Sequence, residues 1–225
     1  QAQRINVSGL TITTSGTGSI LLLQSCRDSS FKDLKLVGTF RNGDSSYGTD
    51  SFTDAGIELV SQSTDITSKD NIFDNVEFEG IGYAVRSKYD IRNNIFNDCE
   101  FRRCGYGIEF GLETLLGVSG QTVGPRNNKI INSTFDDIDR HALWITTGSG
   151  NLSQSNKFYG VGNDGGDQDE SNATYSIIKF VSDGNQTVND WFSRTNDLSI
   201  NQEYINGTPY VPEVEGGSVF ESIYP

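Results

Sequence analysis

A repeat of short apolar motifs is the sequence feature that most restricts the fold of this chain. In each copy, an apolar residue is followed by apolar positions three and five residues later. The copies are Val7/Leu10/Ile12, Phe31/Leu34/Leu36, Phe73/Val76/Phe78, Phe96/Cys99/Phe101 and Ile130/Ser133/Phe135, with a shorter match at Phe158/Val161. Because a recurring unit determines the architecture of a whole chain, this repeat takes precedence over local helix or strand predictions.

A second motif, a small residue followed by an apolar-x-apolar pair, accompanies the first. In four of its five copies it begins at nearly the same distance after the first motif, as from Phe73 to Ala84 and from Phe96 to Gly107. The spacing between successive copies of the first motif varies, and the shortest spacings indicate a basic coil of about 23 residues. Longer spacings indicate insertions, which fall at Gly38 to Ala55 and at Gly111 to Asn127. The copies of the second motif begin at Ser19, Gly56, Ala84, Gly107 and Ala142.

The repeat predicts an all-β, parallel β-solenoid. Its units combine short strands, polar turns, Gly and Asn, without the periodicity of a helix. One coil cannot bury its apolar face alone, so stacked coils bury it between neighbours, with equivalent side chains about 4.8 Å apart. A turn column is expected two residues before the first apolar position, where Asn tolerates left-handed backbone and can bond to adjacent coils. Its members are Asn71, Asn94, Asn128 and Asn156, with Ser29.

The same pattern sets the expected domain organisation. Residues 1–200 form the solenoid, and residues 201–225, which hold three of the four prolines, form an extended C-terminal segment on a neighbouring surface. A strand is expected at Tyr175 to Val181 and an irregular coil at Trp191 to Ile200. Cys99 occupies a core position, where a free thiol acts as a small hydrophobe. A disulfide between Cys99 and Cys104 is the alternative that we do not favour.

The outward position of the second motif holds the first candidate site residues. Stacking places Leu21, Glu58, Arg86, Glu109 and Trp144 in one column. We favour a structural ion-pair ladder of Glu58, Arg86 and Glu109 over a glycosidase-type acid at Glu58 or Glu109. The Trp144 ring is expected to face solvent as a sugar-stacking platform. An equally acceptable interpretation has Trp144 packed beneath an insertion or a partner chain.

A second cluster precedes the small residue of the same motif. Tyr83, Tyr106 and His141 occupy this position in successive coils. His141 is the only histidine, and Asp136, Asp137, Asp139 and Arg140 lie beside it. His141 and Asp139 are therefore acid–base candidates, and the two tyrosines are candidates for glycan stacking. We favour an aromatic stack beside a solvated acidic turn, because no nucleophile or paired carboxylate accompanies the histidine.

Charge and composition restrict the partners. Of the 225 residues, 17 are Lys or Arg and 30 are Asp or Glu, and the net charge of −13 opposes generic binding to nucleic acid or anionic lipid. No apolar run is long enough to span a bilayer, so membrane insertion is not expected. Asp164, Asp167, Asp169 and Glu170 could supply oxygen ligands to Ca²⁺, but their spacing matches neither an EF-hand loop nor the Gly-Gly-x-Gly-x-Asp nonapeptide, and a solvated loop is favoured. No cofactor is expected.

The sequence also contains no Met and its first coil begins at Val7. We therefore expect a piece of a longer protein, with a preceding domain or a partner subunit covering the strand edges of the first coil.

Several segments resemble a known class of protein. The coils NNIFNDCEFRRCGYGIEFG, NNKIINSTFDDIDRHALWI and GNLSQSNKFYGVGNDGG, with WFSRT and YVPEVEGG, are similar to β-helical regions of virion structural proteins of tailed phages, especially myoviruses infecting cyanobacteria. The resemblance covers about residues 70 to 215. It implies a right-handed parallel β-helix with lateral loop insertions, located in the tail, fibre or baseplate periphery on the exterior of the virion. It also implies homotrimeric association and contact with other virion proteins. It supplies no catalytic residue.

Two functions follow as hypotheses. The first is a structural or adhesive module of a phage virion, whose side loops contact sister subunits or host surface glycan. The alternative is a polysaccharide depolymerase or lyase of the tailspike or pectate-lyase type, acting at Glu109, His141 and Trp144. A shared architecture does not by itself confer enzymatic activity, so the sequence favours the non-enzymatic hypothesis.

Overall fold

The structure is a computed structural model of the whole chain. It describes residues 2–40, 54–63, 66–111, 115–116, 122–161, 178–180, 184–192, 203–205, 208–210 and 219–223. Every regular element in these ranges is a β-strand, which confirms the predicted all-β class. Over the same ranges, no helix offers an apolar stretch of membrane-spanning length.

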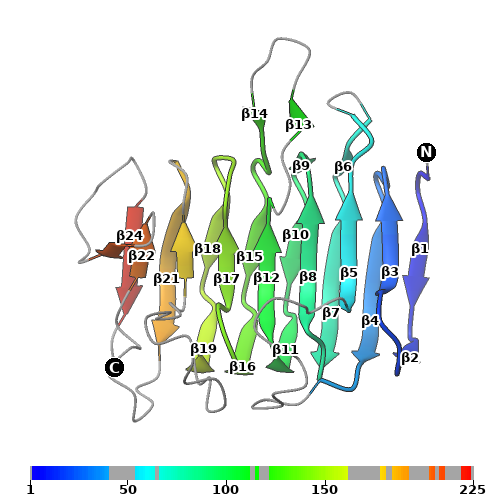
Figure 1. Cartoon of the computed structure of the whole chain (residues 1–225), viewed down its shortest axis with the longest axis horizontal. Helices are drawn as coiled ribbons and strands as arrows, with labels where there is room; N and C mark the ends of the chain where they lie inside the picture. Colours follow the sequence, from blue (N-terminus) through cyan, green and yellow to red (C-terminus); the bar gives the residue numbers. More distant parts are fainter. Residues whose placement is uncertain are drawn as a thin grey trace.

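Two long sheets run side by side along the longest axis of the molecule, from the N-terminal strands at one end to the C-terminal strands at the other (Figure 1). Nearly all strand pairs are parallel, as predicted, and the exceptions in the described residues are β13–β14 and β22–β23. The twelve-stranded sheet contains β1 (Asn6–Ser8), β2 (Thr11–Thr13), β4 (Ser30–Val37), β7 (Ile72–Glu79), β10 (Ile95–Asn97), β11 (Glu100–Cys104), β15 (Lys129–Ile131), β16 (Thr134–Ile138), β18 (Leu152–Gln154), β19 (Lys157–Val161), β21 (Gln186–Phe192) and β24 (Val219–Ile223).

The eight-stranded sheet lies beside it. Its strands are β3 (Ser19–Gln24), β5 (Ala55–Val60), β8 (Tyr83–Lys88), β12 (Tyr106–Phe110), β17 (Leu143–Ile145), β20 (Ile178–Phe180), β22 (Glu203–Ile205) and β23 (Thr208–Tyr210). Two short pairs complete the set, β6 (Ser68–Lys69) with β9 (Ile91–Arg92) and β13 (Leu115–Leu116) with β14 (Thr122–Val123). Successive turns of the chain add neighbouring strands to both long sheets, so equivalent positions stack.

The first sequence motif bends in the middle because its central residue adopts left-handed backbone. Asn75, Asp98, Asn132 and Asn189 have φ between 51° and 55° at equivalent bends. Asn and Asp tolerate this conformation better than other side chains because their short polar groups bond locally. The bend turns the two halves of the motif so that both direct apolar side chains inward.

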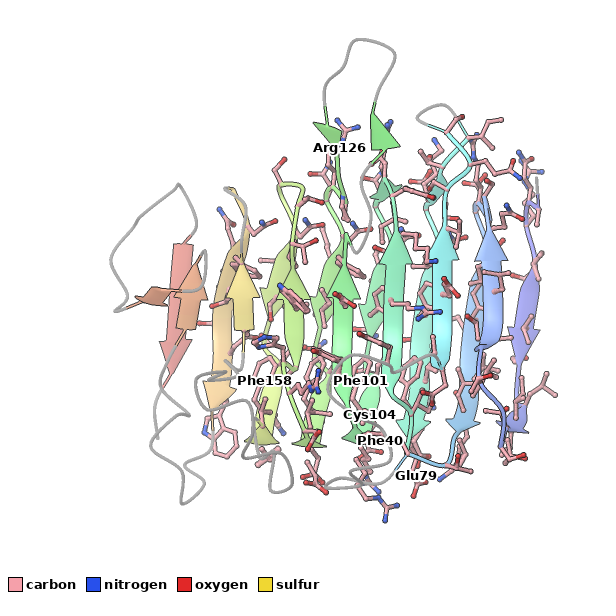
Figure 2. All side chains as sticks on the ribbon, viewed as in Figure 1. Phe40, Glu79, Phe101, Cys104, Arg126 and Phe158 are labelled. Carbon is pink, nitrogen blue, oxygen red and sulfur yellow. The ribbon has the colours of Figure 1, made fainter. Side chains whose placement is uncertain are left out.

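The apolar core follows the motif positions in register. Phe31, Phe73 and Phe96 form one ring stack, with centroid separations of 5.1 and 4.6 Å. A second stack, which includes the labelled Phe101 and Phe158 (Figure 2), has separations of 4.9, 4.3 and 4.9 Å. The members of the second stack are Phe78, Phe101, Phe135 and Phe158. Offset aromatic contacts of this kind add stabilisation to that of apolar burial alone.

The small residue of the second motif has a steric reason. A Cβ atom at Gly107 would lie 2.8 Å from the Phe135 ring and 2.3 Å from the carbonyl oxygen of Ala142. Gly56 meets Phe78 and the carbonyl of Ala84 in the same way. At Gly56 and Gly107, the ring stack and the carbonyl of the next coil thus leave space only for glycine.

The turn column is a continuous ladder of buried amides, with one member corrected. Each Asn Nδ2 donates to the Oδ1 of the next Asn at 2.9 Å. The ladder consists of Asn71, Asn94, Asn128, Asn151 and Asn185. The assignment of Asn156 to this column is wrong. Asn156 instead accepts a hydrogen bond at Oδ1 from the Ser133 amide, because Phe158 pairs with Phe135 and so occupies the last apolar position of the motif and not the first.

This correction also changes the coil lengths. Successive ladder positions are separated by 42, 23, 34, 23 and 34 residues, starting from Ser29. The predicted final repeat, from Ile130 to Phe158, is therefore wrong, and a 23-residue coil and a 34-residue coil take its place. The basic unit is a 23-residue coil, as predicted. Most of the two predicted insertions lies outside the described residues, although β13 and β14 fall within the second.

The remaining expectations concern the cysteines and the C-terminal part. Cys26, Cys99 and Cys104 are free and buried, so the disulfide alternative is wrong. Burial raises the pKa of both Cys99 and Cys104 to about 12. The strand expected at Tyr175 to Val181 is present as β20, and β21 includes Trp191. Beyond residue 200, β22 pairs with β20 and β24 pairs with β21, so this segment also adds strands to the long sheets.

Candidate functional site

The outer face of the eight-stranded sheet carries the predicted candidates. Its central column follows the strand register and contains Leu22, Glu58, Arg86, Glu109, Trp144 and Lys179. The prediction of Leu21 in this column is wrong, because β3 pairs with β5 one residue out of step from the motif alignment, placing Leu22 opposite Glu58. The other four predicted members are confirmed in their positions.

Glu58 and Arg86 form the expected ion pair. Arg86 Nη2 lies 3.1 Å from Glu58 Oε2, and Lys88 Nζ lies 3.7 Å from Glu58 Oε1. Ser19 Oγ also donates to the Glu58 carboxylate. Burial alone would raise the pKa of Glu58, but the bonds from Ser19 and Arg86 and the charges of Arg86 and Lys88 outweigh it and lower the pKa. Glu58 is therefore an ionised, structural carboxylate and not an acid catalyst.

Glu109 lies in the same column as Glu58, but its surroundings and its protonation differ. Its side chain is only 1% exposed, and no described residue forms a hydrogen bond to its Oε2. Burial raises the pKa of Glu109 to about 7, against the opposing effect of the Arg86 charge. Arg86 pairs with Glu58 and forms no ion pair with Glu109, so the predicted ladder ends at Arg86 in the part of the chain that the structure describes.

An aromatic cluster lies at the start of the same strands. Tyr83 and Tyr106 stack with centroids 4.7 Å apart and an interplanar angle of 5°, which confirms their predicted column. His141 is tilted, at 6.1 Å from Tyr106 and 5.3 Å from Trp144. The Trp144 ring packs on Tyr106 at 5.9 Å. Burial and the Glu109 carboxyl raise the pKa of Tyr83, so its hydroxyl stays protonated.

The expectation that the Trp144 ring faces solvent holds only in part, because the side chain is only partly exposed. Trp144 is partly buried, and both it and Tyr83 pack against a small apolar cluster formed by Phe40 and Tyr106. Phe40, labelled in Figure 2, is held by a backbone hydrogen bond from its amide to the Gly80 carbonyl at 2.8 Å. Because Phe40 belongs to the first predicted insertion, the alternative interpretation, packing beneath an insertion, describes Trp144 better.

The turn before β17 adds a cation to this cluster. Arg140 Nη1 donates to the Tyr106 hydroxyl at 3.0 Å, and its guanidinium lies 5.4 Å from the centre of the Tyr106 ring. The amides of Asp139 and Arg140 bond to the carbonyls of Cys104 and Gly105, which fixes the turn. Asp139 and His141 are buried in this turn. The acidic turn expected to be solvated is therefore partly buried at these two residues.

Several contributors to this face were not predicted. Sequence reasoning missed Phe40, Lys88 and the contact of Arg140 with Tyr106. Phe40 lies inside a segment that was identified only as an insertion, and no repeat position marks it. The predicted calcium candidates Asp164, Asp167, Asp169 and Glu170 lie outside the described residues. Within the described ranges, no group of three or more His, Cys, Asp or Glu side chains is placed to hold a metal ion.

The site thus combines three chemical features. Tyr83 and Trp144 present parts of aromatic rings, which can stack on the apolar faces of sugars. Arg86, Lys88 and Glu58 offer charged hydrogen-bonding groups. Glu109 is a carboxylic acid that holds its proton up to about pH 7 and can donate a hydrogen bond. In comparisons with known proteins, no family model matches the chain and no curated protein matches it significantly.

Proposed function

We propose that the chain is a right-handed parallel β-helix module with a structural and adhesive role in a tailed-phage virion. The observation that carries the proposal is the in-register stacking of equivalent positions from coil to coil, which gives an elongated body with one continuous core. Parallel strands joined by a crossover within one sheet are nearly always right-handed, which supports this handedness. Such an elongated body suits a virion appendage that must keep its shape without bending.

Contact with host surface glycan is the adhesive part of the proposal. The aromatic rings and charged groups on the outer face of the eight-stranded sheet have the chemistry of a carbohydrate-binding surface, in which rings stack on pyranoses and charged groups bond to hydroxyls. Trp144 is the residue expected to contribute most, because it is partly exposed and its column also contains the cationic Arg86. Location on the virion exterior, sister subunits in a trimer and neighbouring virion proteins belong to the same proposal.

The test is binding of the purified protein to an array of bacterial lipopolysaccharides and capsular polysaccharides. Trp144→Ala is expected to abolish binding to the glycan that the wild-type protein selects. Trp191→Ala is the matched control, since Trp191 is also partly buried and packs against a tyrosine, Tyr159, at 4.8 Å, but on the other long sheet. Equal losses in both variants, or no glycan bound by the wild-type protein, would contradict the adhesive role.

The depolymerase alternative is favoured by one observation, the raised pKa of the buried Glu109. A carboxylic acid that is still protonated near neutral pH is the form that a glycosidic oxygen requires from a proton donor. Incubation of the bound glycan with the protein would reveal new reducing ends or the absorbance of unsaturated uronates. Product formation that is lost in both Glu109→Gln and His141→Ala would establish the enzyme in place of the adhesin.

A further inference from the structure

A row of basic residues stacks in register along the edge formed by the short strands β6 and β9. Parallel backbone pairing places Arg27 beside Lys69, Lys69 beside Arg92 and Arg92 beside Arg126. Figure 1 shows β6 and β9 at the upper edge of the molecule, and Figure 2 shows Arg126 at this edge, away from Glu79 at the lower edge. We call these four residues the cationic row.

The row concentrates positive charge in a chain whose net charge is −13. Equivalent positions in parallel strands point to the same side, so the four cations repeat at the strand spacing of about 4.8 Å. Their side chains reach solvent, with 36%, 33% and 40% of the side-chain surface exposed for Lys69, Arg92 and Arg126. The row is therefore an accessible line of charge along the long axis of the molecule.

Stacked like charges destabilise a sheet, and neighbouring acidic and carbonyl groups of the same chain offset this repulsion. The carboxylate of Asp90 is fully buried and pairs with Arg92 and, at 3.2 Å, with Arg126. Lys69 lies 3.4 Å from the partly exposed Asp70, and Arg27 Nε donates to the Thr67 carbonyl at 3.2 Å. The buried Asp90 anchors two guanidinium groups side by side, which preorganises them for a second anionic partner on the solvent side.

We infer that the cationic row binds a linear acidic polysaccharide with about one carboxylate per sugar. Arginine pairs well with carboxylates because its planar fork can form two parallel hydrogen bonds. A polyuronate is an extended chain whose charges recur once per ring, on a length scale comparable to the coil spacing. The inference deepens the proposed function by naming the class of glycan, and it rests on that function only in assuming that the protein meets surface polysaccharide.

Single-stranded nucleic acid is the competing polyanion, and one observation disfavours it. Proteins that hold single strands supply aromatic rings on which the bases stack. The row and the residues that follow its members, Asp28, Asp70, Asn93 and Asn127, contain no aromatic side chain.

The experiment measures binding of the full chain to immobilised polygalacturonate at increasing NaCl concentrations, with neutral pullulan and poly(dT) as further probes. The row variant is Lys69→Gln with Arg126→Gln. The control variant is Lys32→Gln with Arg102→Gln, which changes the net charge equally and also removes one ion pair per residue on the twelve-stranded sheet. We expect the row variant to bind more weakly and to reduce the slope of log affinity against log salt by about half, because two of the four cations are removed.

A second variant, Arg27→Gln with Lys69→Gln, leaves the pairs of Asp90 intact and keeps the test decisive if the loss of Arg126 destabilises the fold. Equal weakening in the row and control variants would show that only the overall field matters and would overturn the inference. The inference would also be overturned if the wild-type protein did not bind polygalacturonate, or if it bound poly(dT) as tightly as polygalacturonate. Failure of the proposed adhesive face is distinguished by Trp144→Ala, which leaves the row unchanged.

Discussion

Three carboxyl groups on this chain show how local surroundings set the charge of one residue. Glu58 is buried, but its partners Ser19 and Arg86 lower its pKa. Glu109 is buried without a hydrogen bond at Oε2, and its pKa rises to about 7. Asp190 is fully buried and its pKa rises to about 6 through burial, despite hydrogen bonds from Ser153 and Asn156. The balance between burial, which raises the pKa, and hydrogen bonds and nearby cationic charges, which lower it, decides the sign at each position.

Asp190→Asn is expected to stabilise the protein at neutral and alkaline pH. The folded-state pKa of Asp190, about 6, exceeds the ordinary value of 3.8, so the folded protein binds this proton more tightly than the unfolded chain. Stability therefore falls as the pH rises through this window and stays lower above it. The substitution removes that loss, on the order of 2–3 kcal/mol, and keeps an acceptor for the Asn156 amide.

Urea unfolding of wild type and Asp190→Asn between about pH 3 and about pH 7 measures this effect, because these limits lie about one unit outside the pKa values of 3.8 and about 6. The two curves should converge at acidic pH and separate at neutral pH. Asp98→Asn, at an exposed turn, removes the same charge without altering the buried hydrogen bonds around Asp190 and serves as the control. A variant whose stability stays parallel to wild type at every pH would contradict the raised pKa.

Glu109 is expected to titrate near neutrality. With ¹³C-labelled glutamate carboxyl groups, one NMR resonance should have a midpoint of about pH 7 and should be absent from Glu109→Gln. The physical reason is burial without a compensating hydrogen bond, which favours the neutral acid. Glu100→Gln removes the resonance of a partly exposed carboxylate on β11 and serves to validate the assignment. If the resonance lost from Glu109→Gln titrates at or below 4.5, the protonated state proposed for this residue is wrong.

At the scale of single elements, the turns hold neighbouring coils together as much as the strands do. Asn128 accepts hydrogen bonds from both the amide and the side chain of Asn94, at 3.0 and 2.9 Å. Its own Nδ2 lies 3.2 Å from the Ile91 carbonyl and 2.9 Å from Asn151 Oδ1. Each buried Asn therefore satisfies polar groups of the coils on both sides, and a nonpolar substitute would leave several of them unbonded.

Asn128→Ala is expected to destabilise the protein by about 3 kcal/mol or more, because unsatisfied buried groups cost about 1–3 kcal/mol each. Asn97→Ala is the control, since Asn97 is only partly buried and its Nδ2 bonds to Asp74 at the surface. The control should cost about 1 kcal/mol or less. Thermal unfolding followed by circular dichroism compares the two, and a similar small shift in both would show that the ladder is not a major source of stability.

At the scale of the whole molecule, stability is the sum of contacts between adjacent coils. The core contacts repeat from coil to coil, and extra chain length is accommodated between the end of one strand and the start of the next. Ladder positions separated by 23, 34 and 42 residues still stack directly on one another. One coil can therefore take the place of its neighbour in the stack, provided that its ladder Asn stays in register.

Deletion of residues 71–93, one 23-residue coil, is expected to give a folded but less stable protein. The deletion brings Phe96 onto Phe31 and Phe101 onto Leu36, both of which already face aromatic rings. Deletion of residues 75–96 is the control, because it leaves one extra residue inside the paired motif, where a slip of one residue turns core side chains to the surface. Size-exclusion chromatography and cooperative unfolding separate the outcomes. Equal folding of both deletions would contradict register control by the ladder.

The sequence alone determined the repeat, the all-β class, the parallel stacking and the core positions. These are predictable because a periodic pattern of side chains can be buried in only a few ways. It located Glu58, Arg86, Glu109 and Trp144 in one column, since strand pairing preserves equivalent positions. It misplaced Asn156, because the two halves of the motif resemble each other and apolar spacing cannot distinguish them where Ser153 and Thr187 replace apolar residues.

Only the tertiary structure decided the electrostatic character of these positions. The pKa of Glu109 depends on its burial and on the charge of Arg86, and neither effect follows from sequence spacing. The net charge of −13 indicated a surface that repels polyanions. Folding nevertheless brings Arg27, Lys69, Arg92 and Arg126, which are far apart in the chain, to one spacing along one edge. The net charge is a property of the whole chain, whereas the stacking of coils determines where each charged side chain lies. The binding of a charged ligand depends on that local arrangement.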